Sequence, residues 1–165
     1  MSEQTEHLIV VLIEELEAHG LLIAAAQEMN ASVKNGAVGG VQSACRKYDE
    51  LTCAIASLEE KRLHYSDTIC NTKGVRHVNL LTVIAHVAEP YKKRIFDLRI
   101  QIKKAIDDLS KINFSNEILL KESLLTFHKT YEMLALYNEN KLAGYKKHGK
   151  KAKPLQGTSF VNKIA

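Results

Sequence analysis

The chain has 165 residues, of which 45% are hydrophobic and 25% are charged, as in a soluble globular domain with its own core. All 19 acidic residues lie before position 141, so residues 1–140 have a net charge of −3, whereas residues 141–165 contain seven lysines and no acid. The longest apolar runs, Leu8–Ile13 and Leu21–Ala26, are shorter than the ~18–20 residues of a membrane span, and no signal peptide is recognisable, so we expect a cytoplasmic protein without membrane insertion.

The first predicted helix covers residues 3–34, where apolar side chains recur at steps of three and four residues. Gly20 lies inside this helix and costs about 1 kcal/mol relative to alanine, so we expect a neighbouring helix to approach closely there. Residues 35–40 contain three glycines. They predict a helix reversal, because glycine readily adopts the left-handed backbone that such a turn needs.

The second predicted helix has the clearest periodicity in the chain, with two sets of residues repeating every seven positions over four heptads. Such spacing is typical of the a and d positions of a coiled coil, and Arg62 is the charged residue among them. A helix of ~32 residues is roughly 48 Å long, which predicts an elongated molecule. The two sets are Val41, Tyr48, Ile55, Arg62 and Ile69, and Ala44, Leu51, Leu58, Tyr65 and Thr72.

A short helix over residues 80–87 is predicted next, and Pro90 is expected in the first turn of the last helix. The apolar stripe of that helix is interrupted at Asn113-Phe114-Ser115-Asn116. These residues either form a loop or a polar layer within one helix of about 50 residues. We favour the continuous helix, because no glycine or proline interrupts it, with Asn113 and Asn116 fixing the register as buried asparagines do in coiled coils.

The predicted fold is therefore all-α, an elongated antiparallel coiled-coil bundle of three long helices and one short helix over residues 1–143. Residues 144–165 are rich in lysine and contain glycine and proline, which predicts a mobile basic tail. The tail ends in an apolar cluster at helical spacing, Phe160, Val161 and Ile164. An exposed cluster of this kind usually has a partner, although folding back onto the chain's own groove is the alternative.

No catalytic or metal-binding pattern was found in the sequence. The seven histidines and three cysteines are not at metal-ligand spacing, and adjacent carboxylates such as Glu14 and Glu15 diverge by ~100° on a helix, so we interpret them as solvated. We expect no enzyme, no metal and no cofactor. The odd number of cysteines argues against a disulfide framework, and we expect all three to be reduced and to serve as small hydrophobic residues: Cys45, Cys53 and Cys70.

Three places in the chain resemble the FlgN family of flagellar type III export chaperones. The first is a turn followed by the heptad helix: Val33-Lys34-Asn35-Gly36, then Tyr48, Glu50-Leu51, Ile55, Leu58 and Glu59-x-x-Arg62. The second is an asparagine-marked layer in the last helix: Leu109-x-x-Ile112-Asn113-x-x-Asn116-x-x-Leu119-Leu120. The third is Tyr145-x-x-x-Gly149, a polar linker and the terminal residues Phe160-Val161-Asn162-Lys163-Ile164-Ala165. The pair Gly39-Gly40 and the strongly basic tail differ from the family's usual pattern.

The resemblance implies a chaperone that binds the C-terminal helices of hook-associated proteins at the hook–filament junction, prevents their premature assembly and delivers them to the export gate and its ATPase components. An amphipathic client helix could add its apolar face to an open coiled-coil seam. The residues that we expect to contact the client are Leu142, Tyr145, Phe160, Val161 and Ile164.

Two other functions remain as alternatives. A coiled-coil scaffold would only self-associate. Nucleic-acid binding through the lysine-rich tail is less expected, because the tail contains no arginine and no interleaved aromatic residues. The sequence leaves open the identity of the client and whether the free protein is a monomer or a homodimer.

Overall fold

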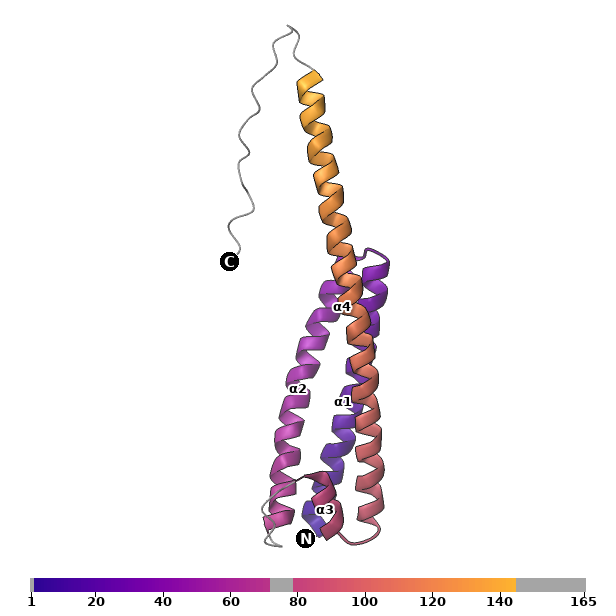
Figure 1. The fold of residues 1–165 in the computed structure, drawn as a ribbon. Coiled ribbons are helices and arrows are strands. Elements are labelled where there is room, and N and C mark those ends of the chain that lie inside the picture. Colours follow the sequence, from indigo (N-terminus) through magenta and orange to yellow (C-terminus); the bar gives the residue numbers. More distant parts are fainter. Residues whose placement is uncertain (1, 72–78, 145–165) are drawn as a thin grey trace. The chain divides into compact units, whose positions relative to one another are not determined.

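The computed structural model describes residues 2–71 and 79–144, and the side chains of residues 3–71 and 79–137. These residues form helices and no strand, as Figure 1 shows. The all-α prediction is thereby confirmed. By their contacts, residues 1–122 form one compact unit and residues 123–165 form a second. The helices are α1 (Ser2–Lys34), α2 (Val38–Asn71), α3 (Leu80–His86) and α4 (Tyr91–Gly144).

The first unit is built on α1 and α2, which lie side by side with opposite chain directions (Figure 1). Glu28 pairs with Lys47 near the connection between the helices, at 2.8 Å. Further from the connection, Glu15 pairs with Arg62 at 3.0 Å. The two ion pairs therefore show that α1 and α2 are antiparallel.

The part of α4 within this unit runs in the same direction as α1. Near the start of both helices the Tyr91 hydroxyl donates a hydrogen bond to Glu6, and near the end of α1 the Asn116 amide donates to the carbonyl oxygen of Ala26. Asn116 and Asn113 lie within α4, so the polar interval is a layer of a continuous helix and the favoured prediction is confirmed.

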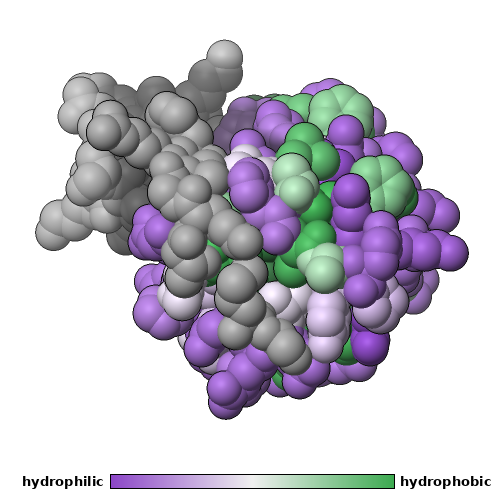
Figure 2. All heavy atoms as spheres, turned by 90° about the horizontal axis from the view of Figure 1, so that it is seen from below, coloured by the Kyte–Doolittle hydropathy of each residue, from purple (hydrophilic) through white to green (hydrophobic). Residues whose placement is uncertain are grey.

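Two apolar clusters hold these helices together, and the heptad residues of α2 that the structure describes are all buried or half-buried, as predicted. The larger cluster lies at the end of the unit where α1 begins and includes Val83 and Ile84 of α3. Figure 2 views this end and shows apolar residues in the middle of a hydrophilic surround. The buried residues of the larger cluster are Leu8, Ile9, Leu12, Ile69, Cys70, Val83, Ile84, Ile95, Leu98 and Ile102; those of the smaller cluster are Ala18, Leu22 and Ile55.

The turn between α1 and α2 is shorter than predicted. Among its glycines only Gly36 has a positive φ, 65°, and α2 already begins at Val38, so Gly39 and Gly40 are helical. The expectation that three glycines supply left-handed backbone was therefore wrong. One such residue is enough, because the reversal needs a single αL position at the end of a helix.

The close approach expected at Gly20 is also absent. A Cβ atom added at Gly20 would have no heavy atom within 4 Å, whereas one added at Gly40 would lie 2.5 Å from the Ser32 hydroxyl oxygen. Of these two glycines, only Gly40, beside the turn, therefore lies against a neighbouring helix. At the other end, α3 finishes at His86, and Pro90 precedes α4 instead of lying in its first turn.

Candidate functional site

Among the polar residues of the first unit that the structure describes, Glu15 is the most buried, with 2% of the residue exposed, and it lies on the face of α1 that meets α2. Arg62 Nε lies 3.0 Å from Glu15 Oε2, and a second guanidinium nitrogen lies 3.8 Å from Glu59 Oε1. Neither Glu15 Oε2 nor Arg62 Nε has an aligned hydrogen-bond partner, so the contact between them is an ion pair. Glu15 was expected to be solvated, and this was wrong.

The pKa of Glu15 is raised, first of all because burial penalises the charged carboxylate, and the Arg62 guanidinium opposes this by favouring the charge. His19, one turn along α1, is buried and satisfied, since its Nδ1 lies 2.7 Å from the carbonyl oxygen of Glu15. A signal in the sequence could have revealed both residues. Glu15 and His19 continue the spacing of four and three residues that joins Leu8, Leu12 and Leu22.

A second polar layer joins the three long helices near the turn. Asn116 is 4% exposed and donates to the Ala26 carbonyl oxygen at 2.8 Å, while its own amide oxygen accepts from Asn30 at 2.7 Å. Asn113 donates to the Tyr48 hydroxyl at 2.7 Å. These hydrogen bonds join the Asn113–Asn116 part of α4 to α1 and α2. That these asparagines and Arg62 set the register of the helices stays a prediction.

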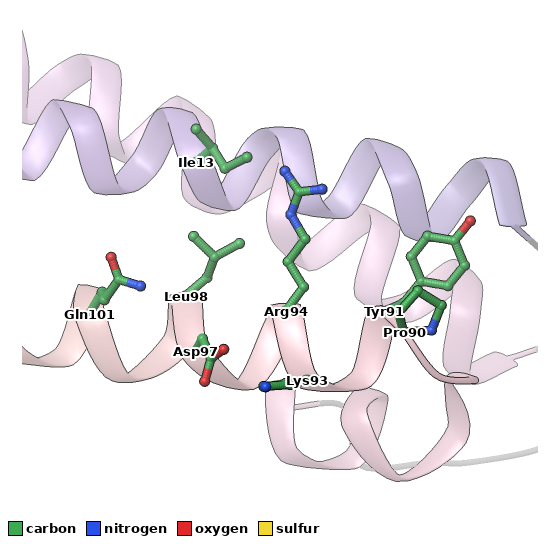
Figure 3. A pocket seen from close by; sticks show the side chains of 8 residues that line it. All are labelled: Ile13, Pro90, Tyr91, Lys93, Arg94, Asp97, Leu98 and Gln101. Carbon is green, nitrogen blue, oxygen red and sulfur yellow. The ribbon is translucent and has the colours of Figure 1, made fainter.

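The surface of the first unit also carries a shallow hollow along α1 and α4, shown in Figure 3. Ile13 and Leu98 lie at its base, and Arg94 extends toward α1, whereas Asp97 and Lys93 point away. A catalytic or cofactor site requires side chains that converge on a common point, and these side chains do not. Among the residues that the structure describes, no group of three His, Cys, Asp or Glu side chains could hold a metal ion.

The most exposed apolar surface belongs to the second unit, in the part of α4 from residue 123 onward. Eight large apolar side chains lie within fourteen residues there, each between 57% and 72% exposed. Four of them follow steps of three, four and three residues and so share one face of the helix. We call these four the aromatic seam: Leu124, Phe127, Tyr131 and Leu134.

The spacing of the aromatic seam is that of a coiled-coil core, but its side chains are uncovered. In the sequence, the aromatic seam continues the apolar stripe that contains Ile95 and Leu98. The spacing alone does not distinguish a covered stripe from an exposed one. Open apolar area of this size marks a surface for a partner. The aromatic seam is therefore the candidate site.

Comparison with known proteins identifies the family of this chain. A family model described as FlgN protein matches residues 1–153. The chain belongs to the FlgN family. Members of this family are flagellar export chaperones, whose work is binding other proteins, and an open apolar helix face suits that work. Neither the curated proteins nor the solved structures contain a match to the chain.

The five residues predicted to contact the client of this FlgN-family chain lie outside the described side chains. Leu142 is within α4, but its side chain is not described, and the other four follow the last described residue. The five residues are Leu142, Tyr145, Phe160, Val161 and Ile164. The family match ends at residue 153, so it includes Leu142 and Tyr145.

The cysteines fit the prediction only in part. Cys70 is buried in the larger cluster, where burial raises the pKa of its thiol, but Cys45 and Cys53 are exposed. The two exposed residues therefore do not serve as core hydrophobes. None of the described helices is both long and apolar enough to cross a membrane.

Proposed function

We propose that this FlgN-family chain is a cytoplasmic chaperone that binds the C-terminal helices of hook-associated proteins, prevents their premature assembly and delivers them to the type III export gate. The observation that carries the proposal is the aromatic seam. Its four side chains are 57–72% exposed at the spacing of a coiled-coil core. A helix that presents such a face is half of an interface whose other half is a second amphipathic helix.

The chemistry of the seam selects an apolar helical client. Leu124 and Leu134 provide aliphatic surface at the two ends, and Phe127 and Tyr131 provide large aromatic surface in the middle. Aromatic residues near the centre of an interface contribute most of the binding free energy, because a partner can exclude water from them completely. The same apolar face on the client would drive its polymerisation, so covering that face also explains the chaperone activity.

The C-terminal residues are proposed to complete the client site. Leu142 and Tyr145 continue along the chain from the aromatic seam, and residues 144–165 end in Phe160, Val161 and Ile164. We propose that this apolar cluster closes over the bound client helix. The lysines of residues 144–165 would then lie at the edge of the client site, where components of the export gate could contact them.

The proposal is tested by binding the full chain to the C-terminal segment of a hook-associated protein from the same genome, measured by isothermal titration calorimetry. Phe127→Ala/Tyr131→Ala should weaken binding by roughly 30-fold or more, since each removes a large side chain from the centre of the interface. A deletion of residues 142–165 tests the tail separately. We expect it to weaken binding, with a larger dissociation rate.

A matched control changes apolar residues of the same helix that lie off the seam, Leu125→Ala/Leu136→Ala. This control should bind the segment within about threefold of the unmodified chain. Equal loss in both double variants would contradict a specific seam. Unchanged binding by Phe127→Ala/Tyr131→Ala would show that the seam is not the client site, and salt-dependent retention of RNA or DNA in place of the segment would favour the nucleic-acid alternative.

A further inference from the structure

A second face of the same α4 segment is not used by the proposed client site. Leu125, Lys129, Glu132 and Leu136 follow steps of four, three and four residues and therefore also form one line along the helix. We call them the mixed seam. Leu125 is 60% exposed and Leu136 59% exposed, and the two charged side chains between them are exposed as well.

The mixed seam points about 150° away from the aromatic seam around the helix, as follows from 100° per residue. A single client helix that lies along the aromatic seam therefore leaves Leu125 and Leu136 in water. The exposed apolar side chains of this segment therefore extend over more of the helix surface than one partner helix covers. We therefore expect a different partner to cover the mixed seam.

The order of residues in the mixed seam is self-complementary. In an antiparallel pair of identical helices related by a two-fold axis, Leu125 of one copy faces Leu136 of the other, and Lys129 faces Glu132. The arrangement gives two Leu–Leu contacts at the outside and two opposite-charge contacts at the centre. In a parallel pair, by contrast, Lys129 would face Lys129 and Glu132 would face Glu132, which is repulsive.

We propose that the mixed seam is a homodimer contact, in which a second copy of this chain packs antiparallel against Leu125, Lys129, Glu132 and Leu136. The charge complementarity fixes the antiparallel orientation. The seam spans eleven residues, or roughly 16 Å, so its area is small for an interface and the association is weak, with a Kd on the order of tens of micromolar or more. Because the aromatic seam is on another face, the dimer still presents two client sites. The inference does not depend on what the aromatic seam binds.

The test is a charge reversal on the full chain, with mass measured by sedimentation velocity from about 5 to 500 μM, a range that brackets the expected Kd. Lys129→Glu places only acids at the centre of the contact and Glu132→Lys places only bases there, so each should weaken self-association by roughly tenfold or more. An equimolar mixture of the two variants should associate again, as a heterodimer. His128 Nε2 lies 3.3 Å from Glu132 Oε1 on the same helix, so all variants are compared in one buffer.

A crosslinking experiment reports the orientation. In a background with Cys45 and Cys53 replaced by serine, Leu125→Cys mixed with Leu136→Cys should form a disulfide between the two variants. Leu125→Cys by itself should form little, because in an antiparallel pair the two positions 125 are roughly 16 Å apart.

The outcomes are decisive in either direction. Recovery of the dimer in the mixture of charge variants, with the crosslink between positions 125 and 136, supports the proposal. A chain that stays monomeric at 500 μM, or a dimer unaffected by the charge reversals, overturns it. A dimer abolished by Phe127→Ala/Tyr131→Ala but not by the charge variants also overturns it, since the second copy would then occupy the aromatic seam. None of these measurements uses a client, so their failure is distinct from failure of the proposed function.

Discussion

Replacing Arg62 with methionine isolates its ion pair with the buried carboxylate of Glu15. The methionine retains most of the apolar stem of the arginine and removes its charge, which leaves the Glu15 carboxylate buried without a cation. Glu15 is 3% exposed at its side chain and Arg62 is 23% exposed, so the two partners are not equivalent. Loss of the arginine should cost much more than loss of the acid.

The magnitude follows from two opposing terms. At 3.0 Å, two unit charges attract by about 5–6 kcal/mol at an effective dielectric constant of ~20, and desolvation of the carboxylate opposes this by several kcal/mol. Without Arg62, Glu15 can become neutral by binding a proton. From its ordinary pKa of 4.5, that protonation costs about 3–4 kcal/mol at pH 7. Protonation thus limits the loss, and we expect Arg62→Met to lower the free energy of unfolding by about 3 kcal/mol at pH 7.

The assay is urea unfolding followed by circular dichroism at 222 nm, at pH 7 and at pH 4. At pH 4 protonation of Glu15 is nearly free, so the loss in Arg62→Met should shrink to about 1 kcal/mol. Glu15→Gln is the matched control. It should cost about 1 kcal/mol at pH 7, because Arg62 still reaches solvent and lies near Glu59.

The pH dependence of the unmodified chain has a defined sign. The folded state raises the pKa of Glu15, so this group binds protons more tightly in the folded state than in the unfolded one. Its contribution to stability is therefore greatest below about pH 4.5 and is lost as the pH rises through the folded pKa. The difference in stability between the unmodified chain and Glu15→Gln should follow this course. Equal losses in Arg62→Met at the two pH values, or a larger loss in Glu15→Gln than in Arg62→Met, would refute the reasoning.

Three further predictions use the same unfolding assay or simple labelling. Asn116→Leu should lower the free energy of unfolding by about 1–3 kcal/mol, because the buried Ala26 carbonyl oxygen and the half-buried Asn30 amide each lose a hydrogen bond; a neutral result would show that water replaces Asn116. Gly20→Ala should stabilise the chain by about 0.5–1 kcal/mol, since its added methyl meets nothing within 4 Å, whereas Gly40→Ala should be neutral or destabilising because of the nearby serine; the reverse order would contradict the packing at the turn. A thiol reagent should label two of the three cysteines quickly in the folded chain and Cys70 only on unfolding, because Cys70 is buried and its thiol pKa is raised; rapid labelling of all three would contradict this.

The sequence by itself determined the helices and their order. Apolar steps of three and four residues are a local property, and they predicted α1, α2 and the unbroken α4 within a few residues of the observed bounds. The polar residues Arg62, Asn113 and Asn116 were also recognisable, because each interrupts an apolar heptad position. The resemblance to the FlgN family rested in part on these positions, and the family match covers them, although it ends at residue 153, before the terminal residues 160–165.

Only the tertiary structure decided which helix faces are covered. The spacing of Glu15 places it on the apolar face of α1, but that this face is covered, and that Arg62 lies against Glu15 while the adjacent Glu14 is exposed, depends on the packing of α2. The apolar stripes that contain Leu98 and Phe127 likewise have the same spacing, yet Leu98 is 8% exposed and Phe127 is 72% exposed. A helix specifies its own apolar faces through its periodicity, but whether a face lies in a core or in water depends on segments far away in the chain. For this reason the aromatic seam can be recognised as an exposed apolar face only once the helices are in place.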